Sequence, residues 1–151
     1  MTPLFKKMNL GEHRSILVMN APESFESELE QLEEIEVFRK TKRGRDIDFG
    51  IYFVKTLKDV AAAAKTHSQA KGDPVIWFAY PKGTSKKYDC EFNRDNGWDA
   101  LGEAGFEGVR QVAIDEDWSA LRFRRVEHIK SLKRSSSMAL TKEGKSRTKK
   151  E

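Results

Sequence analysis

The residues with the clearest chemical potential follow the most apolar run of the chain, in the segment IWFAYPKGTSK at 76–86. In open parallel sheets, ligands bind beyond the carboxyl ends of the strands, where adjacent loops separate. Lys82, with the hydroxyl groups of Thr84 and Ser85, could receive an anionic group there. The loop is not a Walker phosphate-binding motif, because the spacing G-x-x-x-x-G-K is missing. A simpler alternative is that the proline and glycine build a turn and Lys82 is a solvated charge, since turns use these same residues.

Two further loops are expected at the same edge of the sheet, one after the first strand and one between the last two strands. They bring Asn20, Asp115 and Trp118 toward the Lys82 loop. Asn20 and Asp115 would supply polar contacts, and Trp118 a flat wall for a small anionic ligand. Trp118 could instead plug the end of the sheet and leave no room for a ligand.

Arginines on the last predicted strand form a further candidate. Arg122 and Arg124 alternate with apolar residues, so they share one face of that strand with Ala120. Arg122 is therefore included among the candidate ligand-binding residues, on an anion-binding or nucleic-acid-binding face. The alternative is that such arginines keep an outer strand soluble and prevent edge-to-edge pairing.

Strands and helices alternate along residues 1–130, which predicts a single α/β domain. Strands are expected over residues 15–20, 35–40, 47–54, 74–80, 107–115 and 118–126. This order favours a three-layer, Rossmann-like sandwich with a mostly parallel sheet and helices on both faces. The last two strands lie too close for a crossover helix, so they should form an antiparallel hairpin at one edge.

Three helices are expected between these strands. Asn20–Glu23 should cap the first helix, which places Phe25, Leu29 and Leu32 on one apolar stripe. Residues 93–104 should form a weaker helix that buries Trp98 and Leu101.

The second helix should begin at a capping box formed by Thr56 and Asp59. Its buried face is expected to hold Leu57, Val60, Ala61 and Ala64. His67 falls in its last turn, where a cation would be favourable.

The net charge of +4 is concentrated at the end of the 151-residue chain. Residues 131–151 hold 7 Lys/Arg and 2 Asp/Glu, which leaves 21 basic and 22 acidic residues in the rest. This Ser- and Lys-rich segment cannot bury enough apolar surface to offset its ordering entropy, so a disordered basic tail is predicted. Its seven cations could engage the phosphates of a nucleic acid, in binding that would weaken steeply with salt.

Other potential chemistry is weak. Cys90 is the single cysteine, which excludes an intramolecular disulfide and suits a reducing compartment. The histidines have no neighbours at metal-ligand spacing, so no metal site is predicted. The start of the chain lacks a signal-peptide core, and no apolar run approaches the roughly 18 residues of a membrane span. We therefore expect a cytoplasmic protein that does not enter a membrane.

Three motifs carry a resemblance to a known family. VIWFAYPKGTSK is followed about 30 residues later by VAIDEDWSALRF, and LVMNAP precedes both. Together they resemble a family of small bacterial proteins classed as a domain of unknown function, with the patterns W-x-x-[WY]-P-K-x-x-S and A-[VI]-D-x-x-W-S-x-L-R-F. The resemblance covers roughly residues 10–126, and this chain departs from it at Ala120, where many members carry glycine. It implies a fold but no activity.

The order of elements also resembles a trimmed S-adenosylmethionine-dependent methyltransferase domain. Such a domain needs a glycine-rich turn after its first strand, where backbone approaches the cofactor. Here that turn is NAPES, with proline and no glycine, and the second strand ends in basic residues where a ribose-binding carboxylate is needed. No cofactor is therefore predicted.

These observations favour a non-enzymatic module that binds a small anionic ligand or a protein partner. Weak nucleic-acid association through the tail is one alternative. The other is an enzyme acting on a small anionic substrate, with Lys82 and Asp115 as polar contacts.

Overall fold

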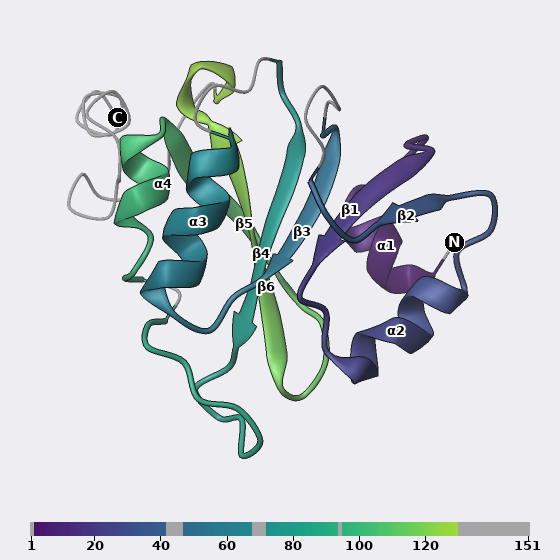
Figure 1. Cartoon of the computed structure of the whole chain (residues 1–151), viewed down its shortest axis with the longest axis horizontal. Helices are drawn as coiled ribbons and strands as arrows, with labels where there is room; N and C mark the ends of the chain where they lie inside the picture. The colour runs from purple at the N-terminus through teal and green to yellow at the C-terminus, as the bar shows by residue number, and fades with distance from the viewer. Residues whose placement is uncertain (1, 42–46, 68–71, 94, 130–151) are drawn as a thin grey trace.

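The computed structural model describes residues 2–41, 47–67, 72–93 and 95–129 (Figure 1). Its helices are α1 (Pro3–Lys7), α2 (Glu23–Glu30), α3 (Leu57–His67) and α4 (Asp99–Glu103), with a 3₁₀ turn, η1 (Val126–His128). Its strands are β1 (Ser15–Met19), β2 (Glu36–Phe38), β3 (Phe49–Phe53), β4 (Val75–Pro81), β5 (Phe106–Ala113) and β6 (Trp118–Arg125). No helix in these ranges is long and apolar enough to cross a membrane. The predicted tail lies outside the described residues.

The strands form one six-stranded mixed sheet in the order β2-β1-β3-β4-β6-β5. The first four strands of this order are parallel. Strand β6 pairs antiparallel with both β4 and β5. The predicted α/β fold and its C-terminal antiparallel hairpin are confirmed. Because β6 lies between two strands, β5 is the outer strand of the hairpin.

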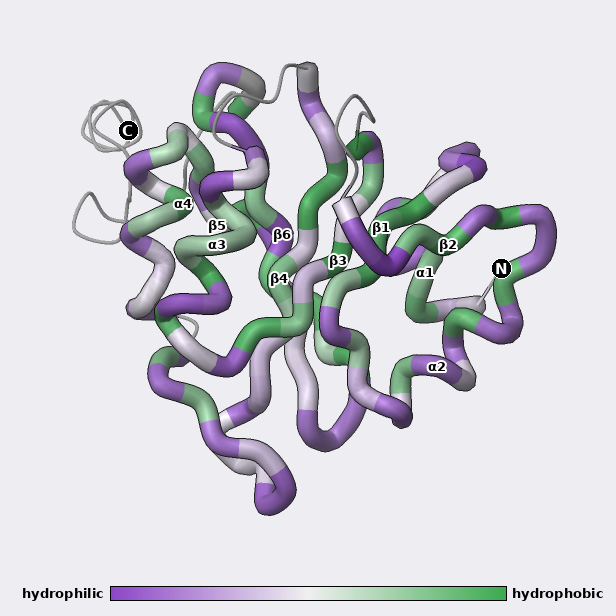
Figure 2. Tube along the Cα trace, viewed as in Figure 1, coloured by the Kyte–Doolittle hydropathy of each residue, from purple (hydrophilic) through white to green (hydrophobic). Residues whose placement is uncertain are grey.

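Helices cover both faces of the sheet. The central strands β3 and β4 are therefore buried along their whole length. On one face, Phe5 and Phe25 from α1 and α2 pack in a core that contains Trp77. On the other face, Val60 and Leu101 from α3 and α4 pack with Phe78. Figure 2 shows hydrophobic colours along the central strands and hydrophilic colours over much of the connecting loops.

Helix α3 begins as predicted. The Thr56 amide donates to Asp59 Oδ2 at 3.2 Å, and the Asp59 amide donates to Thr56 Oγ1 at 3.1 Å. These reciprocal bonds are a capping box, which satisfies two backbone donors at the start of the helix.

The predicted buried face of α3 is partly wrong. Leu57 is 50% exposed, and Ala61 is also exposed. The inward stripe instead begins at Val60 and continues through Ala63, Ala64 and His67. The helical period sets this stripe, since positions i, i+3, i+4 and i+7 lie on one side.

Helix α2 starts later than predicted. The helix has Pro22 at its N-cap and no side-chain capping bond, so the predicted cap by Asn20 is wrong. Asn20 has a φ of 60°, and its left-handed backbone turns the chain at the end of β1 before the helix begins. Phe25 and Leu29 are buried and Leu32 is partly buried, which confirms the predicted apolar stripe.

The helix predicted over residues 93–104 is confined to α4. The Asn93 amide donates to Asn96 Oδ1 at 3.1 Å, and Gly97 has a φ of 90°. These local turns compete with helix formation, because short amide side chains offer the backbone an alternative partner. Trp98 and Leu101 are nevertheless buried as predicted.

Candidate functional site

Two of the three predicted loops meet at the carboxyl end of β4. The backbone pairs Pro81 with Trp118, and the Lys82 amide donates to the Asp117 carbonyl at 2.8 Å. The Ser85 hydroxyl donates to Asp117 Oδ1, also at 2.8 Å. The structure therefore brings the Lys82 loop and the β5–β6 turn together.

The polar side chains of this junction are engaged in building its turns. Asp115 Oδ1 accepts from the backbone amides of Asp117 and Trp118, each at 2.8 Å. Ser85 Oγ accepts from the Tyr88 amide at 3.1 Å. The Ser85 hydroxyl and Asp115 Oδ1 are thus committed to their turns, and the other oxygen of Asp115, Oδ2, can only accept hydrogen bonds, so it does not suit an anionic ligand. The turn-building interpretation is therefore the better supported one for both residues.

The side chains of Lys82 and Thr84, unlike those of Asp115 and Ser85, take no part in building the turns. Lys82 is half-buried and Thr84 is exposed. Within the described ranges, neither side chain has a hydrogen bond or ion pair. Both residues keep the predicted capacity to contact an anion, but Ser85 does not complete a shared site with them.

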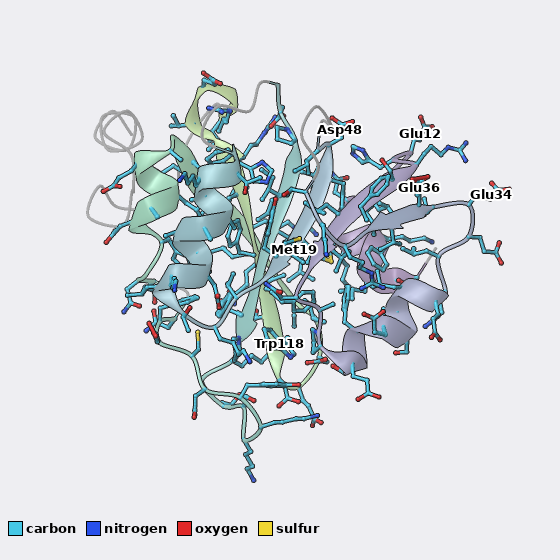
Figure 3. The ribbon with its side chains drawn as sticks, in the orientation of Figure 1. Glu12, Met19, Glu34, Glu36, Asp48 and Trp118 are labelled. Atoms are coloured by element: carbon cyan, nitrogen blue, oxygen red, sulfur yellow. The ribbon has the colours of Figure 1, made fainter. Side chains whose placement is uncertain are left out.

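Trp118 closes the end of the sheet. It is 2% exposed, and its ring lies edge-on to Phe53 with centroids 5.1 Å apart and beside Tyr88 at 5.0 Å. Figure 3 shows Trp118 within the body of the molecule, at the lower end of the strands. Tyr80, on the other face of the sheet, is also buried. A ring packed in this way fits the role of a plug and leaves little surface to serve as a ligand wall.

Asn20 lies apart from this junction. It follows β1, and β3 stands between β1 and β4 in the sheet. Its side chain is exposed and makes no hydrogen bond with the described part of the Lys82 loop. The three predicted loops therefore share an edge without forming one polar cluster.

Arg122 is also separate from the strand ends. It lies four residues after Trp118 along an extended strand, about 13 Å away. Its backbone partners are Trp77 on β4 and Arg110 on β5. The predicted alternation is confirmed, because Ala120 belongs to the α1–α2 core while Leu121 and Phe123 belong to the opposite one.

The position of β6 weakens the alternative interpretation of its arginines. A strand paired on both sides has no free edge to protect, so solubility of an outer strand does not explain Arg122. Arg124 has a clear partner: its Nη2 lies 2.6 Å from Asp73 Oδ2. Arg122 is half-buried, and its Nε is buried with no hydrogen-bond partner.

The surroundings of Arg122 disfavour its charge. Burial lowers the pKa of the Arg122 guanidinium, and the nearby positive charges of Arg124 and Arg110 lower it further. Asp73 opposes this effect but is already bound by Arg124. A guanidinium held among cations attracts an anion.

Sequence reasoning missed Arg110 as a partner of Arg122. A β-bulge between Gly108 and Arg110 shifts the register of β5 against β6, and this shift places the two arginines opposite each other. The bulge has no clear signal in the sequence other than the glycine itself.

A second missed feature is a buried pair of titratable side chains. The Tyr52 hydroxyl is hydrogen-bonded to Nε2 of His67, and both residues are almost fully buried. Burial, and secondarily the charge of Arg125, lower the pKa of His67 to about 4. His67 lies in the last turn of α3 as predicted, but the expectation of a favourable cation there is wrong. Desolvation outweighs the helix dipole at this site.

The remaining candidates offer no reactive group. Cys90 is half-buried, and burial raises the pKa of its thiol, which disfavours the nucleophilic thiolate. Within the described part of the chain, no three His, Cys, Asp or Glu side chains could hold a metal ion together.

A shallow hollow lies beside the amino ends of β1 and β3. It is lined by Ser15, Ile16, Leu17, Phe38, Lys40, Thr41, Ile47, Asp48 and Phe49. Figure 3 shows Asp48 in the upper part of the molecule, away from Trp118. None of the predicted site residues lines this hollow.

Comparisons with known proteins do not distinguish between the candidate functions. No protein-family model matches the chain, and no curated protein matches it either. The family resemblance carried by the three motifs therefore stays a prediction.

Proposed function

We propose that the protein is a non-enzymatic binding module that recognises an anionic group on a ligand or partner. The observation that carries this proposal is Arg122. Its guanidinium lies on an interior strand, directly opposite Arg110, and its buried Nε has no acceptor. Burying part of a charged group without a partner is costly, and because Arg122 is only half-buried, an external anion can approach the accessible part of its side chain and offset that cost.

The absence of an enzymatic role is supported by the strand ends. Asp115 would be a polar contact in an enzyme acting on an anionic substrate, but its carboxylate already accepts two backbone amides. Trp118 is buried, and its ring packs against Phe53 and Tyr88. A binding role needs a recognition surface, and it does not need catalytic groups arranged around a reacting atom.

The scaffold is proposed to be a three-layer, Rossmann-like sandwich of the methyltransferase type. The parallel strands β2, β1, β3 and β4, with helix-derived cores on both faces, support this assignment. The turn that would hold the adenosyl cofactor differs, because α2 begins after Pro22 and carries Glu23 and Glu26 in its first turn. Negative charges at a helix N-terminus oppose the binding of an anionic group there.

The proposal is tested by equilibrium binding of the full chain at constant ionic strength. Inorganic phosphate, acetate and S-adenosylmethionine are titrated separately and followed by calorimetry and by thermal unfolding. We expect saturable binding of at least one simple anion and no binding of S-adenosylmethionine. A ligand contributing about 2 kcal/mol would raise the melting temperature by several degrees. Binding of S-adenosylmethionine at micromolar strength, or no binding of either simple anion, would overturn the proposal.

A further inference from the structure

We infer that Arg110 and Arg122 together bind one dianionic phosphate group, either free phosphate or a phosphomonoester, on the α1–α2 side of β5 and β6. This inference rests on the proposed function, because it names the anion and the residues of the binding face.

The first support is the pairing of the two arginines. Residues opposite each other in an antiparallel pair have Cα atoms about 4.5–5.5 Å apart, with side chains on the same face. Arg110 and Arg122 are such a pair. Like charges directly opposite each other destabilise a sheet, so this pair lowers the stability of the free protein. A bound dianion would convert the repulsion into attraction.

The second support is the distribution of acceptors around Arg122. Asp73 is the carboxylate that acts most clearly on it, and Asp73 is held by Arg124. Arg124 Nε lies 3.0 Å from both carboxylate oxygens of Asp73, and its Nη2 lies 2.6 Å from Oδ2. Glu107 is also on this face, opposite Arg124, but the charges that shift the pKa of Arg122 are those of Arg124, Asp73 and Arg110. Arg124 therefore has a built partner, whereas Arg122 and Arg110 have none within the described residues.

The third support is the rigid wall on the other side of Arg122. Trp77, its backbone partner on β4, is fully buried, and its Nε1 donates to the Met8 carbonyl at 2.9 Å. The indole N–H is thus committed elsewhere. Trp77 therefore offers a ligand neither accessible surface nor a free donor toward β4, and the second guanidinium, that of Arg110, lies toward β5.

Phosphate fits this pair better than a single carboxylate. A guanidinium offers a planar fork of donors that matches two oxygens of one anion. A phosphomonoester carries a charge of about −1.5 to −2 near pH 7 and three terminal oxygens. Two forks and two positive charges are therefore complemented by one phosphate, whereas acetate neutralises only one of the two charges.

The test uses the full chain at pH 7.5 and constant ionic strength. Inorganic phosphate, methyl phosphate and acetate are titrated by calorimetry into wild type, Arg122→Gln and Arg110→Gln. We expect each substitution to weaken phosphate binding about tenfold or more, because each removes charge-assisted hydrogen bonds. Acetate should bind wild type at least about tenfold more weakly than phosphate.

Lys82→Gln is titrated as well, as the test of the strand-end loop. Lys65→Gln is the matched control, because it removes one exposed cation from the last turn of α3, on the opposite face of the sheet, and leaves the arginine pair, the strand-end loop and the tail intact. It should change phosphate affinity by less than about twofold. Arg110 is exposed, so Arg110→Gln keeps the test valid if Arg122→Gln unfolds the protein. Stronger binding of methyl phosphate than of free phosphate would identify a phosphomonoester as the ligand, and the reverse would identify free phosphate.

The two proposals fail in different ways. If phosphate binds wild type, Arg110→Gln and Arg122→Gln equally, the arginine pair is not the site, although the protein still binds anions. If Lys82→Gln alone abolishes binding, the site lies at the strand ends. If neither phosphate nor acetate binds wild type, the proposed function falls together with this inference.

Discussion

The buried His67 predicts a marked loss of stability in mild acid. Its imidazole is 1% exposed, and its hydrogen bond to the Tyr52 hydroxyl is made in the neutral form. Unfolding exposes His67 to water, where its pKa returns from about 4 to 6.5. The unfolded chain therefore binds a proton more readily than the folded one, and stability falls as the pH is lowered from about 6.5 to 4.

The magnitude follows from the separation of the two pKa values. Since one pKa unit corresponds to about 1.4 kcal/mol, the full effect of His67 is about 3 kcal/mol. Between pH 7 and pH 5 the unfolded imidazole is almost fully protonated while the folded one stays neutral, so about 2 kcal/mol is lost over that interval. For a domain of this size, such a loss lowers the melting temperature by about 4–8 °C.

The assay is urea unfolding at pH 7, 6 and 5, followed by tryptophan fluorescence and far-ultraviolet circular dichroism. The informative comparison is the double variant Tyr52→Phe/His67→Leu, which removes both polar partners together and so leaves no buried group unsatisfied. Other titrating groups act equally in both proteins, so the double variant should lose about 2 kcal/mol less than wild type between pH 7 and pH 5. Tyr52→Phe alone should keep the acid sensitivity. An identical acid loss in wild type and the double variant would refute the reasoning.

Three further predictions concern packing, backbone and the tail. Trp118→Ala should cost about 3–5 kcal/mol in urea unfolding, because a plug leaves a cavity, whereas a Trp118 that formed only a ligand wall would cost much less. Gly97→Ala should cost at least about 2 kcal/mol, because a Cβ there would lie 2.4 Å from Phe92 Cβ on a backbone with φ of 90°; a melting temperature within a degree of wild type would contradict this. Deletion of residues 131–151 should abolish salt-sensitive DNA binding in a filter or anisotropy assay and leave phosphate binding unchanged, and DNA binding that survives the deletion would place that activity in the body.

The local features of the fold could be predicted from the sequence because they depend on neighbouring residues. The capping box of Thr56 and Asp59 needs only two side chains three positions apart, and it is present. The apolar runs that become β3 and β4 are buried at every position, as expected for strands covered on both faces. The short connection between β5 and β6 required an antiparallel pair, and the sheet has one.

The features that could not be predicted depend on register and on competing local geometry. The pairing of Arg110 with Arg122 follows from a bulge, and a shift of one residue would send the arginine side chains to the other face. Asn20 has a good capping side chain, but its left-handed backbone ends β1 and leaves Pro22 at the start of the helix. The neutral state of His67 depends on the sheet and on Tyr52, fifteen residues away, which the helical position alone does not reveal.

The candidate site illustrates why residue type is a weak guide to binding. Asp, Ser, Lys and Gly build turns and also bind anions, so the sequence alone could not separate these roles at the end of β4. In the structure, the two roles are distinguished by whether each polar group already has a hydrogen-bond partner. Asp115 and Ser85 have internal partners that hold their turns, and the indole Nε1 of Trp118, which has none, is enclosed with its ring. The half-buried Arg122 guanidinium, by contrast, is a charged group with a buried donor that has no partner. A charged group left unsatisfied on an interior strand carries a free-energy cost that an external anion can remove. For that reason the sheet face, and not the loop richest in suggestive residues, is where binding is expected.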